Sequence, residues 1–135
     1  MPTIMADHDV EGHLQLLLNI WAQPEWSELW AEMACDIASF ERLGIDAKSS
    51  DEQIWRLCQE QAIILITGNR NAEGENSLES TIRKLGMPES LPVLTIGSPG
   101  RLMKDRQYAE RVAARVYDYL RCLDNVRGSG RLFLP

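Results

Sequence analysis

A dense group of ionisable residues, Asp7-His8-Asp9, stands directly after an apolar stretch at the start of the chain. If the backbone stays extended there, the Asp7 and Asp9 side chains point the same way, because alternate residues of a strand share a face. Two carboxylates that face one point can bind a hard divalent cation such as Mg²⁺, which prefers oxygen ligands and keeps several waters. The group, with Glu11 two positions further on, is therefore a candidate metal site.

These residues also have ordinary structural explanations. Asp9 stands where it can cap the following helix, a position at which a carboxylate is favoured by the backbone amides and the helix dipole. His8, between two aspartates, is more typical of an exposed side chain than of a ligand, and His13 lies inside a predicted helix. Asp7 has no comparable structural explanation, so it is the stronger candidate of the pair.

A second polar group follows the apolar run at residues 62–66. Asn69 and Asn71 offer carbonyl oxygens to a metal, or amide groups to phosphate or to a base. A tight turn after a strand explains them equally well, because Asn and Gly tolerate left-handed backbone angles. Asp51 is a third candidate, although first-turn stabilisation of a helix also accounts for it.

The elements that must position these side chains can be read from apolar periodicity and from capping residues. Strands are predicted at residues 2–6, 62–66 and 91–96, with a short strand at 45–47 and an edge strand at 131–134. Helices are predicted at residues 10–21, 25–43, 51–61, 76–85 and 105–123, and a turn at 97–100. Ser50 with Gln53, and Asn76 with Glu79, have the spacing of capping boxes.

This alternation of strands and helices predicts the α/β class, a three-layer parallel sheet flanked by helices, because parallel strands need a helix-sized connection. The length of 135 residues fits one domain over residues 1–135. Ligands in such open sheets bind at the carboxyl ends of the strands, where both polar groups fall.

The net charge of −6 hides an asymmetry. Residues 1–100 hold 6 basic and 16 acidic side chains, whereas residues 101–135 hold 8 basic and 4 acidic ones. An acidic body alone would repel nucleic acid, but an acidic metal pocket beside a basic rim would not. A solvated helix of mixed charge is the plainer explanation, since the arginines after residue 105 are interleaved with acids.

Composition excludes several protein classes. The longest apolar stretch is too short to cross a bilayer, no signal peptide is visible at the start, and a cytoplasmic location is expected. The three cysteines Cys35, Cys58 and Cys122 are predicted to be reduced, buried thiols. The chain contains no ATP-type phosphate loop, no dinucleotide fingerprint and no GxSxG elbow. A receiver-type signalling domain would need an aspartate at the end of a central strand, where this chain has Thr67.

Three segments resemble the bacterial and archaeal PIN-like domains of the small type related to VapC-class toxins. They are IMADHDVEGHLQLLL, LGIDAKSSDEQIWRLCQEQAIILITGNRN and LPVLTIG with YAERVAARVYDYL. Asp7 matches the catalytic aspartate of the family, and Asp51 matches an aspartate that opens a helix. Thr67, Asn69 and Asn71 fall on its Thr-x-Asp-x-Asp pattern, and both aspartates are asparagine here.

The resemblance implies a PIN-like fold and a Mg²⁺- or Mn²⁺-dependent ribonuclease, in which acidic residues bind metal that activates water. It implies Asp7 as the principal ligand and Asp9 and Asp51 as supporting carboxylates. Asn69 and Asn71 would be ligands or substrate contacts. It also implies a small antitoxin-like protein partner, and the tryptophan-rich stretch from Trp21 to Trp30 is compatible with a homo-oligomer. The alternative is a catalytically weak or inactive PIN-like module that binds or regulates, because the two asparagines remove negative charge.

Overall fold

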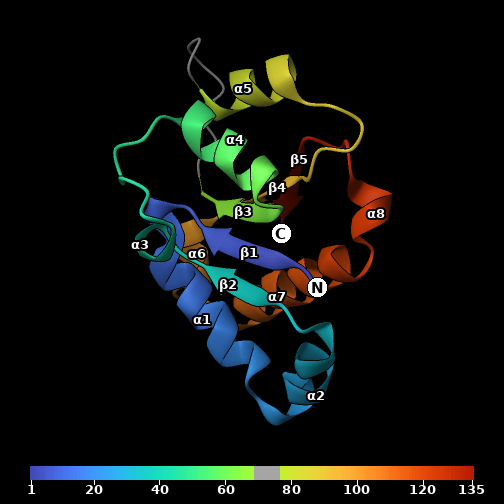
Figure 1. Ribbon diagram of the computed structural model, residues 1–135. Helices are drawn as coiled ribbons and strands as arrows, with labels where there is room; N and C mark the ends of the chain where they lie inside the picture. Colours follow the sequence, from blue (N-terminus) through green and yellow to red (C-terminus); the bar gives the residue numbers. More distant parts are fainter. Residues whose placement is uncertain (69–76) are drawn as a thin grey trace.

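The computed structural model describes residues 1–68 and 77–135, which form a parallel sheet between two layers of helices (Figure 1). The described strands make a five-stranded sheet in the order β2-β1-β3-β4-β5, with every neighbouring pair parallel. The strands are β1 Thr3–Ala6, β2 Asp36–Ala38, β3 Ile63–Thr67, β4 Val93–Ile96 and β5 Arg131–Leu134. The predicted α/β class, with helices flanking a parallel sheet, is confirmed.

Helices cover both faces of the sheet, as Figure 1 shows. One layer is formed around α1 Glu11–Trp21, α2 Pro24–Met33, α6 Pro99–Leu102 and α7 Arg106–Arg121, and α8 Leu123–Val126 follows α7. The other layer is formed by α3 Phe40–Leu43, α4 Asp51–Glu60 and α5 Leu78–Leu85. A short 3-10 turn, η1 His8–Val10, links β1 to α1.

Each face of the sheet has its own hydrophobic core. Ile64 and Ile66 pack on the α1 and α7 side, whereas Ile63 and Leu65 pack on the α4 and α5 side. Because both faces are covered, β3 is apolar without alternation, as is usual for the central strands of parallel sheets. The apolar run that predicts this strand is therefore a consequence of its position in the middle of three layers.

The strand order places a topological switch point between β1 and β3. The chain leaves β1 toward β2 on one side, while β3 pairs with β1 on the other. Ala6 stands opposite Ile66 in the register, so the next residues along, Asp7 and Thr67, meet at the carboxyl edge. In open α/β sheets the crevice outside this point is the usual place for ligands.

The predicted helix over residues 25–43 is wrong. The chain forms α2, then β2, then the short helix α3, and Ala34 turns left-handed at the end of α2 with φ 52°. β2 exists because Asp36–Ala38 lie against β1, where tertiary pairing overrides local helical preference. Arg42 holds this edge strand by donating to both carboxylate oxygens of Asp36, at 3.1 and 2.8 Å, and to the Ile37 carbonyl.

Other boundaries also differ from the predictions. Residues 45–47 form no strand, because β2 occupies that edge of the sheet. The predicted turn at 97–100 contains the first residues of α6, which begins at Pro99. The capping box of Ser50 and Gln53 at the start of α4 is confirmed. At α5 the cap is Ser77, whose hydroxyl accepts from the Ser80 amide, and Asn76 lies outside the described residues.

The tryptophans and cysteines differ in how deeply each is buried. Trp21 is fully buried and stacks on Trp30 with ring centroids 4.0 Å apart, which joins α1 to α2. Cys58 is buried and Cys35 half-buried, but Cys122 is exposed, so the prediction of burial is wrong for that thiol. Cys122 is exposed because it follows the last turn of α7, beyond the helix face that packs on the sheet.

Within the described residues, no helix is long and apolar enough to cross a membrane.

Candidate functional site

Asp7 is fixed at the switch point by three hydrogen bonds. Its amide donates to the Ile66 carbonyl across 2.7 Å, which extends the pairing of β1 with β3 by one residue. One carboxylate oxygen, Oδ1, accepts from the His8 amide at 2.8 Å, so Asp7 caps the turn η1. The other, Oδ2, accepts from the fully buried Thr67 hydroxyl at 3.1 Å. The carboxylate is therefore held in one orientation at the edge of the sheet.

This geometry changes the structural explanations of the two aspartates. Asp7 has a capping role that the sequence does not predict, whereas the N-cap of α1 is Val10 rather than Asp9. The extended backbone expected from Asp7 to Asp9 is also absent, because β1 ends at Ala6 and a 3-10 turn follows. Both residues nevertheless lie at the carboxyl edge, because η1 follows β1 directly and the Asp9 carboxylate lies against Gly68, just after β3.

Asp9 lies against the backbone that follows β3. Its Oδ2 is only 3.3 Å from the point where a Cβ on Gly68 would stand. Partial burial raises the pKa of the Asp9 carboxyl, and the negative charge of Asp7 raises this pKa further. A hydrogen bond from the Asp9 backbone and the nearby His13 and His8 oppose the shift. Two carboxylates whose charges repel each other at one site are an arrangement that a cation would stabilise.

Three loops that follow β1, β3 and β4 converge at this point. A Cβ on Gly68 would come within 3.0 Å of Pro99 Cγ and 3.1 Å of Val10 Cγ1, so a glycine suits this close contact. His13 Nε2 donates to the Pro99 carbonyl at 3.0 Å, which ties α1 to α6. The sequence gives no role to His13, and its spacing of four residues from Asp9 is the only available signal.

Tyr108 supports the same edge from α7. Its buried hydroxyl accepts from the Ser98 amide at 3.0 Å, just after β4. The guanidinium of Arg101 lies 4.8 Å from the centre of the Tyr108 ring, and that of Arg111 lies 5.6 Å from it. Positive charge is thus held next to the loop of Pro99, on the same side of the sheet as His13.

The other predicted ligands are placed less tightly. Asp51 is half-buried in the first turn of α4, whose N-terminus is at the carboxyl edge because α4 runs antiparallel to β3. Glu11 is exposed and lies 3.4 Å from His8. Over residues 1–68 and 77–135, no three His, Cys, Asp or Glu side chains gather closely enough to hold a metal ion. Asn69 and Asn71 lie outside the described residues, so their predicted roles stay predictions.

A donor set of two carboxylates is compatible with Mg²⁺, which often takes one or two protein carboxylates and completes its octahedron with water. Asp7 and Asp9 supply hard oxygen donors of this kind. Thiolate chemistry is disfavoured near them, because burial first and the charge of Asp7 second raise the pKa of Cys58 to about 12. Burial likewise raises the pKa of Cys35 to about 12.

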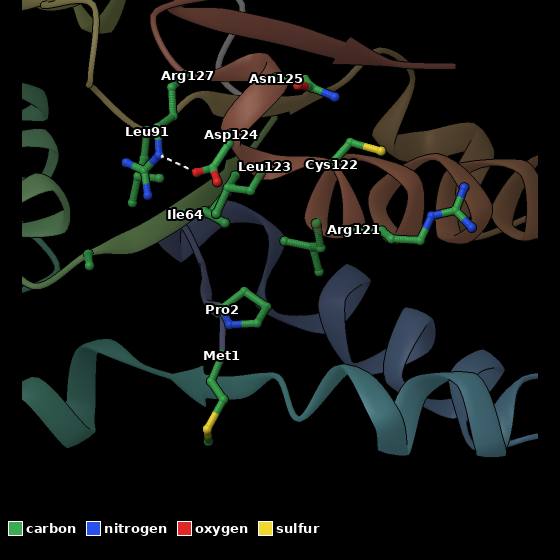
Figure 2. A pocket seen from close by; sticks show the side chains of 12 residues that line it. Met1, Pro2, Ile64, Leu91, Arg121, Cys122, Leu123, Asp124, Asn125 and Arg127 are labelled. Atoms are coloured by element: carbon green, nitrogen blue, oxygen red, sulfur yellow. Dashed lines mark hydrogen bonds and ion pairs between the residues drawn. The ribbon is translucent and has the colours of Figure 1, made fainter.

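A clear hollow also exists at the opposite, amino edge of the sheet (Figure 2). Its volume is about 520 Å³, and its lining includes Met1, Pro2, Leu91 and the segment from Arg121 to Arg127. The ion pair drawn there joins Arg127 to Asp124 at 3.1 Å, so its charges largely satisfy each other. The pocket therefore contains space without the paired carboxylates of the carboxyl edge.

A scan against protein-family models, a search of curated proteins and a search of solved structures each find no match to this chain.

Proposed function

We propose that this chain is a PIN-like, Mg²⁺- or Mn²⁺-dependent ribonuclease whose site is the carboxyl edge between β1 and β3. The observation that supports it most is the placement of Asp7. Its carboxylate is held by the Thr67 hydroxyl and the His8 amide at the switch point, beside a second carboxylate whose pKa is raised. Functional sites commonly combine a fixed geometry with a shifted pKa, as these two residues do.

In this proposal Asp7 is the principal metal ligand and Asp9 the second, with Asp51 and Asn69 as further ligands and Asn71 as a substrate contact. A bound Mg²⁺ or Mn²⁺ would lower the pKa of its water and neutralise charge developing on the scissile phosphate. The net reaction adds water to phosphorus and breaks the bond to the leaving ribose oxygen, which takes up a proton.

The residues of the chain have separable tasks in this scheme. Asp7 holds its orientation through Thr67, which fixes its carboxylate at the carboxyl edge of the sheet. Asp9 must be ionised to bind a cation, and its raised pKa makes binding weaken as the pH falls. His13 positions the loop of Pro99 and does not itself need to contact substrate.

A second candidate function is a PIN-like binding or regulatory module without strong catalysis. It is favoured by the asparagines at 69 and 71, and by the lack of a three-ligand cluster over the described residues. A small antitoxin-like protein would be a natural partner of either version. A gene for a small DNA-binding protein beside that of this chain would support such a partner.

Calorimetry with Mg²⁺ and Mn²⁺ tests the proposal directly. The wild-type chain should bind metal in the range up to millimolar, and Asp7→Asn should abolish the binding. RNA cleavage should require the metal and stop when a chelator is added. The absence of binding at millimolar metal would remove the nuclease function. Metal binding without cleavage would leave the regulatory module as the better description.

A further inference from the structure

A surface beside the candidate site could bind the substrate of the proposed ribonuclease, and its assignment rests on that proposed function. Beside the paired carboxylates, the chain carries two arginines on one tyrosine. Arg101 and Arg111 lie 4.8 and 5.6 Å from the centre of the Tyr108 ring, so their guanidinium carbons are within about 10 Å of each other. Both side chains are exposed although the ring beneath them is buried. The cations are therefore presented to solvent on a fixed platform.

This platform is joined to the candidate site through a short chain of contacts. The Tyr108 hydroxyl accepts from the Ser98 amide, and the next residue, Pro99, contacts both His13 and the Gly68 backbone. Gly68 in turn lies against the Asp9 carboxylate. The arginines thus stand one loop away from the two aspartates.

The two arginines differ in whether a neighbouring carboxylate neutralises their charge. Arg101 forms an ion pair with Asp105 at 3.2 Å, which partly neutralises it. Over residues 1–68 and 77–135, Arg111 forms no ion pair with a carboxylate. The nearest acid on its helix, Glu110, is already bonded to Arg106 at 3.1 Å. Arg111 is therefore a cation held in place by packing, and it can accept an external anion.

A groove continues from Arg111 along the outside of the molecule between α7 and α2. Its volume is about 710 Å³, and it is lined by Trp26, Gln107, Glu110, Arg111 and Ala114. Trp26 is half-buried and fixed edge-on against Tyr117, with the ring centres 5.4 Å apart. The groove thus combines one unneutralised guanidinium with one immobilised aromatic ring.

We infer that this groove binds single-stranded RNA, with a backbone phosphate on Arg111 and an unstacked base against Trp26, while Arg101 adds positive charge beside Tyr108. Proteins that bind single strands combine a cationic track with aromatic side chains on which bases stack. Duplex RNA fits the groove less well, because its bases are already stacked and offer no free face to Trp26. The surface would lead one strand toward Asp7 and Asp9, and it assigns a task to the basic C-terminal quarter of an acidic chain.

The test measures binding apart from cleavage. Fluorescence anisotropy with labelled oligouridine of about 12 nucleotides is recorded in chelator, so that no metal-dependent reaction can occur. The full chain should bind, and Arg111→Gln should raise Kd about tenfold. The slope of log K against log salt should fall by about 0.7, as expected when one single-strand phosphate contact is lost. Trp26→Leu, which keeps an apolar side chain, should also raise Kd about tenfold.

Arg121→Gln is the matched control. Arg121 lies on the same helix as Arg111, and its replacement by Gln removes the same charge. Its guanidinium also lies over a tyrosine, 5.8 Å from the centre of the Tyr117 ring, but Arg121 lines the pocket at the opposite edge of the sheet. Its Kd and salt slope should change little. An equal effect of Arg121→Gln and Arg111→Gln would overturn the inference, because binding would then reflect overall charge. Failure of the wild-type chain to bind oligouridine at low salt would overturn it as well.

The two proposals fail in different ways. Normal metal-dependent cleavage with binding unaffected by Arg111→Gln would remove the groove and leave the ribonuclease. Binding that depends on Arg111 and Trp26, without cleavage in Mg²⁺ or Mn²⁺, would support the groove and remove the nuclease. Tighter binding of a duplex than of oligouridine would contradict the single-strand inference. Unfolding curves for each variant show whether a loss of binding reflects loss of structure.

Discussion

The two edges of the parallel sheet are built from the same strands and have opposite chemistry. At the carboxyl edge, Asp7 and Asp9 are brought together, and partial burial and mutual repulsion raise the pKa of Asp9. At the amino edge there is a pocket of about 520 Å³ (Figure 2), but Asp124 is 94% exposed and paired with Arg127. The pocket at the amino edge therefore lacks the neighbouring carboxylates of the carboxyl edge.

The difference follows from the direction of the strands. In a parallel sheet every strand delivers its next residues to the same edge, so Asp9 after β1, Gly68 after β3 and Pro99 after β4 lie close together there. At the amino edge the chain arrives from helices that have just ended, and the residues there mainly close turns. Residues from distant segments can therefore form a site at the carboxyl edge, whereas the amino edge mainly contains turns and loops.

The largest expected effect is a loss of metal affinity when the principal ligand is replaced. Asp7→Asn should weaken Mn²⁺ binding by at least about 100-fold, more than is typical for residues that only support a ligand. The matched change at the other edge, Asp124→Asn, should leave metal binding unchanged and alter the free energy of unfolding by less than about 1 kcal/mol, because the pair is exposed. Calorimetry and urea unfolding measure both. Equal metal affinities for the two variants would contradict the contrast between the edges.

The next effect concerns the support of Asp7. Thr67→Val removes the hydroxyl that donates to Asp7 Oδ2 while keeping a β-branched side chain in a fully buried position. Metal affinity should fall by about 10- to 100-fold, as for other residues that orient a ligand.

The control for this change is Thr95→Val, one strand further from the site. Thr95 stands beside Thr67 in the register, but its hydroxyl accepts from Arg131 instead of supporting a carboxylate. It should lower stability and leave metal affinity nearly unchanged. If Thr95→Val weakened metal binding as much as Thr67→Val, the effect would belong to the sheet and not to Asp7.

A third effect is one of packing. Gly68→Ala should destabilise the chain by about 1–3 kcal/mol, because the new methyl group would press on Pro99, Val10 and Asp9. Gly12→Ala should instead stabilise it by up to about 1 kcal/mol, since Gly12 lies in α1 and its added Cβ meets open space. Urea unfolding with a shared m-value gives both free energies. A stabilising Gly68→Ala would mean that the three loops do not converge as closely as described.

The smallest effect is a pH dependence carried by Asp9. Because its folded-state pKa is raised, the folded chain holds the proton more tightly than the unfolded chain. Without metal, stability should therefore fall as the pH rises from the ordinary value of 3.8 through the raised pKa. Asp9→Asn should remove this step and be more stable than wild type at pH 7. Unfolding free energies measured from pH 3 to pH 7 check the sign, and identical profiles would refute it.

Local signals in the sequence identify most of the elements. The capping box of Ser50 and Gln53 is found because both partners lie within four residues. The apolar runs of β3 and β4 are found because both faces of those strands are buried. β2 is missed because three residues, Asp36–Ala38, become a strand only through pairing with β1.

The sequence predicts only part of the candidate site, because local signals identify the acids but not the distant residues that contact them. Asp7 and Asp9 stand out because two carboxylates directly follow a predicted strand. Their partners do not stand out. His13 looks like an ordinary helical residue, and Gly68 and Pro99 look like turn residues until the three loops are seen to meet.

The order of residue types alone determined the class of the fold, the edge of the sheet that carries the acids and the uneven distribution of charge. Only the folded chain decided which distant groups touch: the Thr67 hydroxyl on Asp7 and the Gly68 backbone on Asp9. The physical reason is range. Periodicity and capping act over a few residues, whereas these contacts join segments as much as 60 residues apart, through strand register and helix packing.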